Sequence, residues 1–135
     1  MSEGHEQVAT LRPRPLSPHL SVYKPQMSSV MSILHRATGA FLALGVLLLG
    51  AWLWGAAFDA ELFALISTNM SHVVGQVLVL AWAGAFYYHM FNGIRHLGWD
   101  MGYGFSVPAM TRSGWLVLLL AAGFTAWLAH YVWMR

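Results

Sequence analysis

The sequence predicts an all-α membrane protein with three transmembrane helices. Of its 135 residues, 58% are hydrophobic and only 9% are charged, whereas an average soluble domain is about 25% charged. So few charges could not cover the surface of a water-soluble globule of this length. A transmembrane helix needs about 20 apolar residues, and the chain contains three apolar runs long enough to cross a membrane. We therefore expect a single transmembrane domain.

A polar segment precedes the first apolar run. Residues 1–31 contain four of the five prolines, which interrupt any helix. No apolar stretch in this segment leads to a small-residue cleavage site, as a signal peptide would require. We expect a retained cytoplasmic segment, and a first helix that begins behind an N-cap at Ser28 or Ser29.

Residues 32–135 are expected to form the three-helix domain. The expected spans are residues 37–58, 73–91 and 114–134, in which no Asp, Glu, Lys or Arg occurs. Residues 59–72 are expected to form a short loop with two acids and no base. Residues 92–113 contain Gly102, Gly104 and Pro108, which are typical of helix ends and turns.

The basic residues are distributed unequally between the two sides of the membrane. Six of the seven precede the first span or connect the second to the third, namely Arg12, Arg14, Lys24, Arg36, Arg95 and Arg112. Only Arg135 follows the third span. Since loops rich in Lys and Arg stay in the cytoplasm, we expect a cytoplasmic N-terminus and an external C-terminus. The expected surroundings are membrane lipid and partner proteins, with no nucleic acid.

The absence of cysteine limits the chemistry of the chain. With no Cys, it can form no disulfide, thiolate-bound zinc site or Cys-ligated iron–sulfur cluster by itself. Gly102 and Gly104 lack the third glycine and the strand–turn–helix context of a phosphate-binding loop, so we expect no flavin or nucleotide bound by a Rossmann loop. Redox or metal chemistry must use His or come from a partner.

A first polar cluster lies where the first span begins. At about 100° per residue, Ser32, His35, Arg36 and Gly39 share one helical face. In one interpretation Arg36 extends to the interface and Ser32 hydrogen-bonds a backbone carbonyl. In the other, this face binds a ligand with carbonyl or carboxylate oxygens, because Arg supplies a fixed charge and several donors, and Ser a neutral donor.

A second polar cluster lies at the end of the second span. One helical stripe contains His89, Asn92, Gly93, His96 and Asp100, and Arg95 points elsewhere. A His within the membrane indicates a functional site by default. His89 either forms a hydrogen bond between helices or is an axial ligand of a haem iron, with Gly93 leaving room for the macrocycle. A second ligand could be His35 of this chain or a His of a partner.

Three motifs together resemble the larger cytochrome b membrane-anchor subunit of succinate dehydrogenase, respiratory complex II. They are residues 14–23 (RPLSPHLSVY), 32–39 (SILHRATG) and 89–100 (HMFNGIRHLGWD). The resemblance extends to the chain length and the three-span topology, and the motifs are most similar to mitochondrial and alphaproteobacterial members. It implies a multi-subunit transmembrane bundle shared with a second, smaller anchor subunit.

The resemblance also implies a haem site. It makes His89 the axial ligand of haem b, with the second ligand a His of the small anchor subunit. It makes His35, Arg36 and His96 candidates for binding the haem propionates.

The quinone site implied by the resemblance lies nearby. Ser32 and Arg36 match residues that bind ubiquinone, and Asp100 matches an acid near that site that is a candidate proton carrier. No residue of this chain is expected to be catalytic in the oxidation of succinate.

The implied function is that of a non-flavin subunit in the respiratory chain and the tricarboxylic acid cycle. The chain would anchor the flavoprotein and iron–sulfur subunits in a bacterial inner membrane, or in the mitochondrial inner membrane of a eukaryote. One alternative is an anchor of fumarate reductase or of another quinone-linked enzyme. Another is a cofactor-free bundle, in which His89 and Arg36 only bridge helices.

Overall fold

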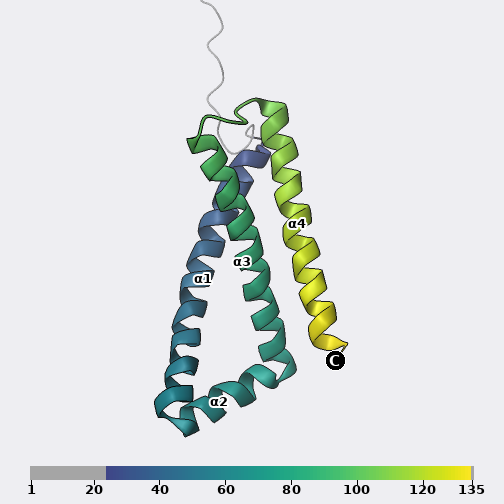
Figure 1. Cartoon of the computed structure of the whole chain (residues 1–135). Coiled ribbons are helices and arrows are strands. Elements are labelled where there is room, and N and C mark those ends of the chain that lie inside the picture. The colour runs from purple at the N-terminus through teal and green to yellow at the C-terminus, as the bar shows by residue number, and fades with distance from the viewer. Residues whose placement is uncertain (1–23, 135) are drawn as a thin grey trace, which may run out of the picture.

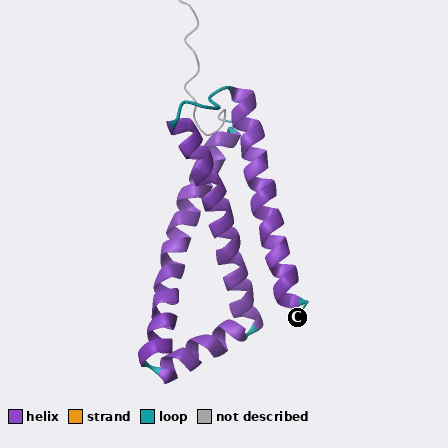
Figure 2. Ribbon diagram, in the orientation of Figure 1, coloured by secondary structure: helices purple, strands orange, loops and turns teal. Residues whose placement is uncertain are grey.

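A computed structural model describes residues 24–134 of the chain. The motif at residues 14–23 and the side chains of Arg12, Arg14 and Arg135 lie outside the described residues. Helices form nearly all of the described part, which contains no strand (Figure 2). They are α1 (Met27–Phe58), α2 (Ala60–Ser71), α3 (Val73–Asp100) and α4 (Val107–Trp133).

Three of these helices are long and apolar enough to cross a membrane. They are α1, α3 and α4, with 32, 28 and 27 residues. At a rise of about 1.5 Å per residue, each exceeds the roughly 30 Å thickness of the hydrocarbon core. The prediction of an all-α membrane protein with three spans is confirmed. Because α1 begins before its apolar run and α3 continues to Asp100, both polar clusters lie on helices.

The start of α1 differs from the prediction. The helix begins at Met27 behind Gln26, so the N-cap expected at Ser28 or Ser29 is wrong. Gln26 has an extended backbone and its side chain makes no capping bond. Its carbonyl oxygen accepts from the amides of Ser29 at 3.0 Å and Val30 at 3.1 Å. The chain turns into the helix directly after Pro25, so both serines fall within the first turn.

The loop expected at residues 59–72 is also wrong, because most of this segment is the 12-residue helix α2. Asp59 is its N-cap, and the carboxylate accepts from the amide of Leu62 at 3.0 Å. Good helix formers follow the cap. Trp52 of α1 donates its indole N–H to the Ser67 hydroxyl at 2.9 Å, which attaches α2 to α1.

Helices α1 and α3 are close together at only one end of the molecule (Figure 1). Helices α1 and α3 lie together near the α3–α4 loop and separate toward α2, which joins their far ends, while α4 runs beside α3 (Figure 1). The buried hydrophobic core consists of Met31, Tyr88, Val117 and Ala121. The Tyr88 hydroxyl donates to the Met31 carbonyl at 2.9 Å. A Cβ at Gly114 would lie 2.8 Å from the Met31 sulfur, so a larger residue there would require the Met31 side chain to move.

Most large apolar side chains of the spans face outward. Leu47 is 71% exposed, Leu119 68% and Leu44 67%. Such side chains can be covered by lipid or by the helices of another subunit. The surface therefore suits a membrane-embedded chain within a larger bundle.

Candidate functional site

Three imidazoles from the two polar clusters meet where α1 and α3 are close together. The His35 and His89 rings are stacked, with centroids 3.8 Å apart and planes at 11°. The His96 ring lies 5.2 Å from the His35 ring. The structure thus brings residues from two separate motifs into one site, beside the buried core.

The hydrogen bonds of His89 determine its tautomer. Its Nδ1 lies 3.1 Å from the His35 carbonyl oxygen and 3.3 Å from the Thr38 hydroxyl. A carbonyl can only accept, so Nδ1 carries the proton. The Thr38 hydroxyl lies 2.8 Å from the Leu34 carbonyl, to which it donates, so its oxygen can accept from His89. The neutral ring therefore has its lone pair on Nε2, and metal-bound imidazoles commonly donate their other nitrogen to a carbonyl in this way.

Small residues surround the two stacked rings. A Cβ at Gly39 would lie 3.0 Å from Cε1 of His89, and one at Gly93 would lie 3.9 Å from Cε1 of His35. In the described part of the chain, no group of three or more His, Asp or Glu could hold a metal ion. A metal here would need ligands from a cofactor, and a haem needs only axial ligands from protein. The available Nε2 and the small neighbours fit a haem iron.

The His35 ring lies flat against the His89 ring. Its Nδ1 is buried and has no hydrogen-bond partner among the described residues. Since buried polar atoms are nearly always paired, this nitrogen fits an acceptor or donor supplied by a bound group.

Ser32 and Arg36 are adjacent on α1, as their spacing predicted. Nη2 of Arg36 donates to the Ser32 hydroxyl oxygen at 3.1 Å. The hydroxyl proton of Ser32 therefore remains free to be donated elsewhere. The Arg36 side chain is exposed, so a ligand or a partner subunit can reach this pair.

His96 and Asp100 take different positions. His96 lies in the site, with Nε2 3.4 Å from the Asn92 amide nitrogen and its ring edge-on to Trp99. Asp100 is exposed at the last position of α3. The structure does not place its carboxylate against the imidazoles.

Arg95, for which the sequence predicts no role, lies in a buried position between α3 and α4. It is 9% exposed, donates to the Ser113 hydroxyl at 2.9 Å and to the Met110 carbonyl at 2.9 Å, and stacks on the Trp99 ring at 4.1 Å. A further bond reaches Asn92 at 3.3 Å. No local pattern in the sequence indicates this role, because a buried guanidinium needs several acceptors nearby and two of them lie on α4.

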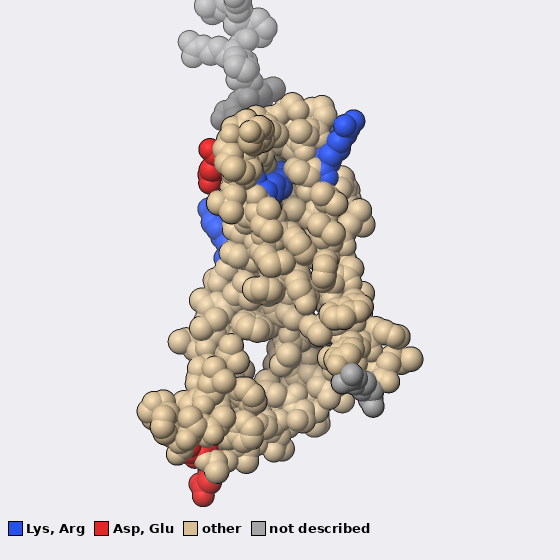
Figure 3. Space-filling view, in the orientation of Figure 1, with Lys and Arg blue, Asp and Glu red and all other residues tan. Residues whose placement is uncertain are grey.

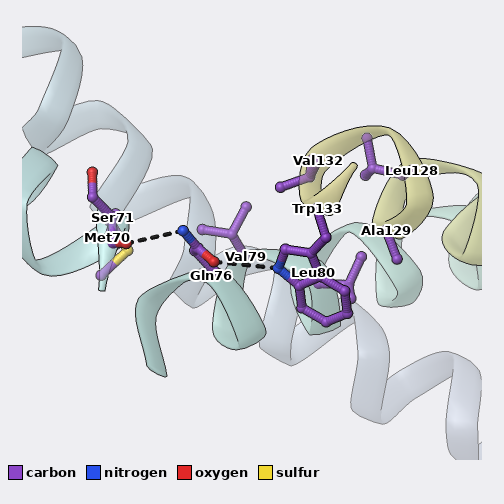
Figure 4. Close-up of a pocket in the computed structure, with 9 residues that line it drawn as sticks. All are labelled: Met70, Ser71, Gln76, Val79, Leu80, Leu128, Ala129, Val132 and Trp133. Atoms are coloured by element: carbon purple, nitrogen blue, oxygen red, sulfur yellow. Dashed lines mark hydrogen bonds between the residues drawn. The ribbon is translucent and has the colours of Figure 1, made fainter. Parts of the chain in front are cut away.

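A pocket also lies at the far end of the molecule, where α2, α3 and α4 meet (Figure 4). Gln76 lies at its centre and links two elements, since it donates to the Ser71 carbonyl at 2.9 Å and accepts from the Trp133 indole at 3.2 Å. None of the predicted site residues lines this pocket. It is therefore separate from the imidazole site.

Charge is concentrated near the imidazole site. On the face shown in Figure 3, Lys and Arg occur only toward the end of the molecule that carries the α3–α4 loop. Asp59 and Glu61 lie at the opposite end, at the start of α2.

Three spanning helices and a histidine site with an available Nε2 define a class: helical integral membrane proteins suited to a redox cofactor. The family model described as succinate dehydrogenase/fumarate reductase transmembrane subunit matches residues 10–129. The chain belongs to this family, within which it is of the alphaproteobacterial and mitochondrial cytochrome b type. The resemblance inferred from the three motifs is thus confirmed.

Curated relatives cover most of the chain. The succinate dehydrogenase cytochrome b556 subunit of Rickettsia bellii is 45% identical over 112 residues, which are 83% of this chain and 87% of that protein. The cytochrome b556 subunit of Rickettsia prowazekii is 44% identical over 106 residues, or 78% of this chain and 82% of that protein. The mitochondrial succinate dehydrogenase cytochrome b560 subunit of Sus scrofa is 39% identical over 109 residues, which are 79% of this chain and 64% of that protein.

Proposed function

We propose that this chain, a membrane-anchor subunit of succinate dehydrogenase, binds haem b through His89 and forms part of the ubiquinone-reduction site through Ser32 and Arg36. One observation carries the proposal. His89 directs Nδ1 to the His35 carbonyl at 3.1 Å, and this bond orients an available Nε2 within the bundle.

Each residue of the haem site has a separate task in this proposal. Haem b supplies a one-electron carrier when bound. His89 would supply one ligand to the iron through Nε2, and a His of the small anchor subunit would supply another. His35, Arg36 and His96 donate to the propionates, because imidazole N–H groups and a guanidinium suit carboxylate oxygens.

Ser32 and Arg36 bind the quinone ring in this proposal. Arg36 donates to the Ser32 oxygen at 3.1 Å, so that both side chains can still donate to a carbonyl oxygen of the ring. Ubiquinone takes up two electrons and two protons to give ubiquinol, and negative charge develops on its oxygens during the reaction. Donors held close to that charge lower the barrier. Asp100, exposed at the end of α3, is the candidate that brings protons from the aqueous side.

The remaining chemistry belongs to other subunits. A chain without Cys ligates no iron–sulfur cluster, so the iron–sulfur and flavoprotein subunits oxidise succinate and deliver the electrons. The small anchor subunit covers part of the outward-facing apolar surface. The basic end of the molecule faces the soluble subunits in the cytoplasm of a bacterium, with the N-terminus on that side of the inner membrane. The corresponding site in a eukaryote is the mitochondrial inner membrane.

The substitution Arg36→Leu tests the quinone part of the proposal. In the assembled complex, succinate-to-ubiquinone activity should fall by about 100-fold, the usual effect of losing a donor to a developing oxyanion. Succinate oxidation with an artificial dye as acceptor should persist, because dye reduction does not need the ubiquinone site. Arg112→Leu is the control, since Arg112 is also a basic residue and is exposed at the same end, and it should leave both activities unchanged.

An equal loss of both activities in Arg36→Leu would contradict the proposal. It would show that Arg36 stabilises the assembly instead of acting on the quinone. Arg36→Lys extends the test, because a lysine keeps the charge without the planar set of donors and should restore only part of the ubiquinone activity.

A further inference from the structure

A line of polar contacts connects Arg95 to His96 through Asn92. Asn92 is completely buried, at 0% exposure. Its Oδ1 lies 3.3 Å from Nη1 of Arg95, and its Nδ2 lies 3.4 Å from Nε2 of His96. All three residues belong to α3, and successive members are neighbours on the helix surface.

The guanidinium determines the direction of every bond in this line. An Arg side chain has donors and no acceptor, so it must face the oxygen of the Asn92 amide. The Asn92 NH₂ group then faces His96 and donates to Nε2. An Nε2 that accepts carries no proton, so the proton of the neutral His96 ring is on Nδ1.

Arg95 is itself held in place, so this direction is fixed. Its other donors are bound to the Ser113 hydroxyl at 2.9 Å and the Met110 carbonyl at 2.9 Å, both on α4. Its guanidinium carbon lies 4.1 Å from the centre of the Trp99 ring. The tautomer of His96 therefore depends on the packing of α3 against α4, which holds Arg95 in place.

We propose that Arg95 and Asn92 are positioning residues that fix His96 as the Nδ1–H tautomer and so make it a hydrogen-bond donor toward the imidazole site. His89 and His96 are then both protonated at Nδ1, but they differ in which ring nitrogen is bound by the protein. His89 gives Nδ1–H to the protein and keeps an Nε2 lone pair for a metal. His96 gives its Nε2 lone pair to the protein and keeps Nδ1–H for an anionic oxygen. That this anionic oxygen belongs to a haem propionate rests on the proposed function, whereas the tautomer of His96 does not.

Solid-state ¹⁵N NMR of the assembled complex in native lipid tests the tautomer directly. With histidine labelled only at Nε2, the His96 signal is the one that disappears in His96→Gln. We expect this signal to be that of an unprotonated nitrogen in the unmodified complex. In Asn92→Asp, the carboxylate accepts from both Arg95 and His96, so the signal should move to that of a protonated nitrogen. A protonated Nε2 in the unmodified complex would overturn the proposal.

Substitutions of Arg95 test whether this residue sets the direction of the hydrogen bonds through Asn92 to His96. Arg95→Lys retains an obligatory donor and should leave Nε2 unprotonated, whereas Arg95→Gln can donate or accept and should raise the protonated fraction. Arg112→Gln is the matched control, because Arg112 is exposed, and it should have no effect. Identical signals in Arg95→Gln and Arg112→Gln would refute a role for Arg95. The absorption spectrum of the same samples reports haem binding separately, so failure of the proposed function would be recognised independently.

Discussion

At the scale of single residues, contacts with backbone and with small neighbours decide what His89 can do. The carbonyl that accepts from its Nδ1 belongs to His35, on another helix, and Gly39 lies against its ring. The periodicity of α3 predicted a polar stripe containing His89. It could not predict the tautomer, because the acceptor is 54 positions away in the chain.

The space beside His89 gives a prediction for Gly39→Val. Because even a Cβ at this position would lie 3.0 Å from Cε1 of His89, a valine should displace the ring at a cost of about 1–3 kcal/mol. The assembled complex should then contain less haem, or haem with a shifted absorption spectrum. In the control Gly50→Val, where a Cβ meets nothing within 4 Å, the spectrum should stay normal. Equal spectra in the two variants would show that the Gly39 contact does not position His89.

The residues of the site were predictable to different degrees. Ser32 and Arg36 are four positions apart, and this spacing alone places them together on a helix. The structural role of Arg95 was not predictable, since its partners Ser113 and Met110 lie on α4, whose packing against α3 no local pattern reveals.

At the scale of helices, hydropathy predicted the spans but not where the helices begin and end. The length of an apolar run matches the thickness of the hydrocarbon core. A helix can continue beyond the hydrocarbon core into the polar interface. That extension places the motif residues of α1 and α3 on rigid helices. Helix α2 was missed because it is short and carries acids, although Asp59 followed by Ala60, Glu61 and Leu62 is typical of a capped helix start.

The cap of α2 can be tested with Asp59→Ala. Losing the bond from the Leu62 amide should destabilise α2 by about 1 kcal/mol. Hydrogen exchange measured by mass spectrometry should be faster by several-fold in peptides from α2 and unchanged in peptides from α4. Asp59→Asn retains a capping oxygen and should behave like the unmodified chain. If Asn and Ala accelerated exchange equally, charge rather than capping would be responsible.

At the scale of the whole molecule, the bundle is asymmetric in packing and in charge. The buried core, the three imidazoles and the basic residues of the described part share one end, whereas α2 and two acids lie at the other. The fold class was predictable from composition, and the charge asymmetry was predictable from the positions of the basic residues along the chain. The separation of α1 and α3 toward α2 was not predictable, because it depends on contacts between helices that no local sequence pattern reveals.

The proposed orientation can be measured because the chain has no Cys. A single cysteine at Glu61 should react with a membrane-impermeant maleimide added to spheroplasts, because we place α2 on the external side. A cysteine at Tyr103, in the exposed α3–α4 loop, should react only after the membrane is permeabilised. The reverse pattern would show that the N-terminus is external.

We propose that His89 of this chain binds the haem iron of complex II. The most direct measurement is the reduced-minus-oxidised absorption spectrum of the purified, assembled complex carrying His89→Leu. His130→Leu, at an exposed His near the far end of α4, is the control and should retain the spectrum of the unmodified complex. We predict that the low-spin haem b signal is lost or strongly altered only in His89→Leu. An unchanged low-spin spectrum in that variant would contradict the claim.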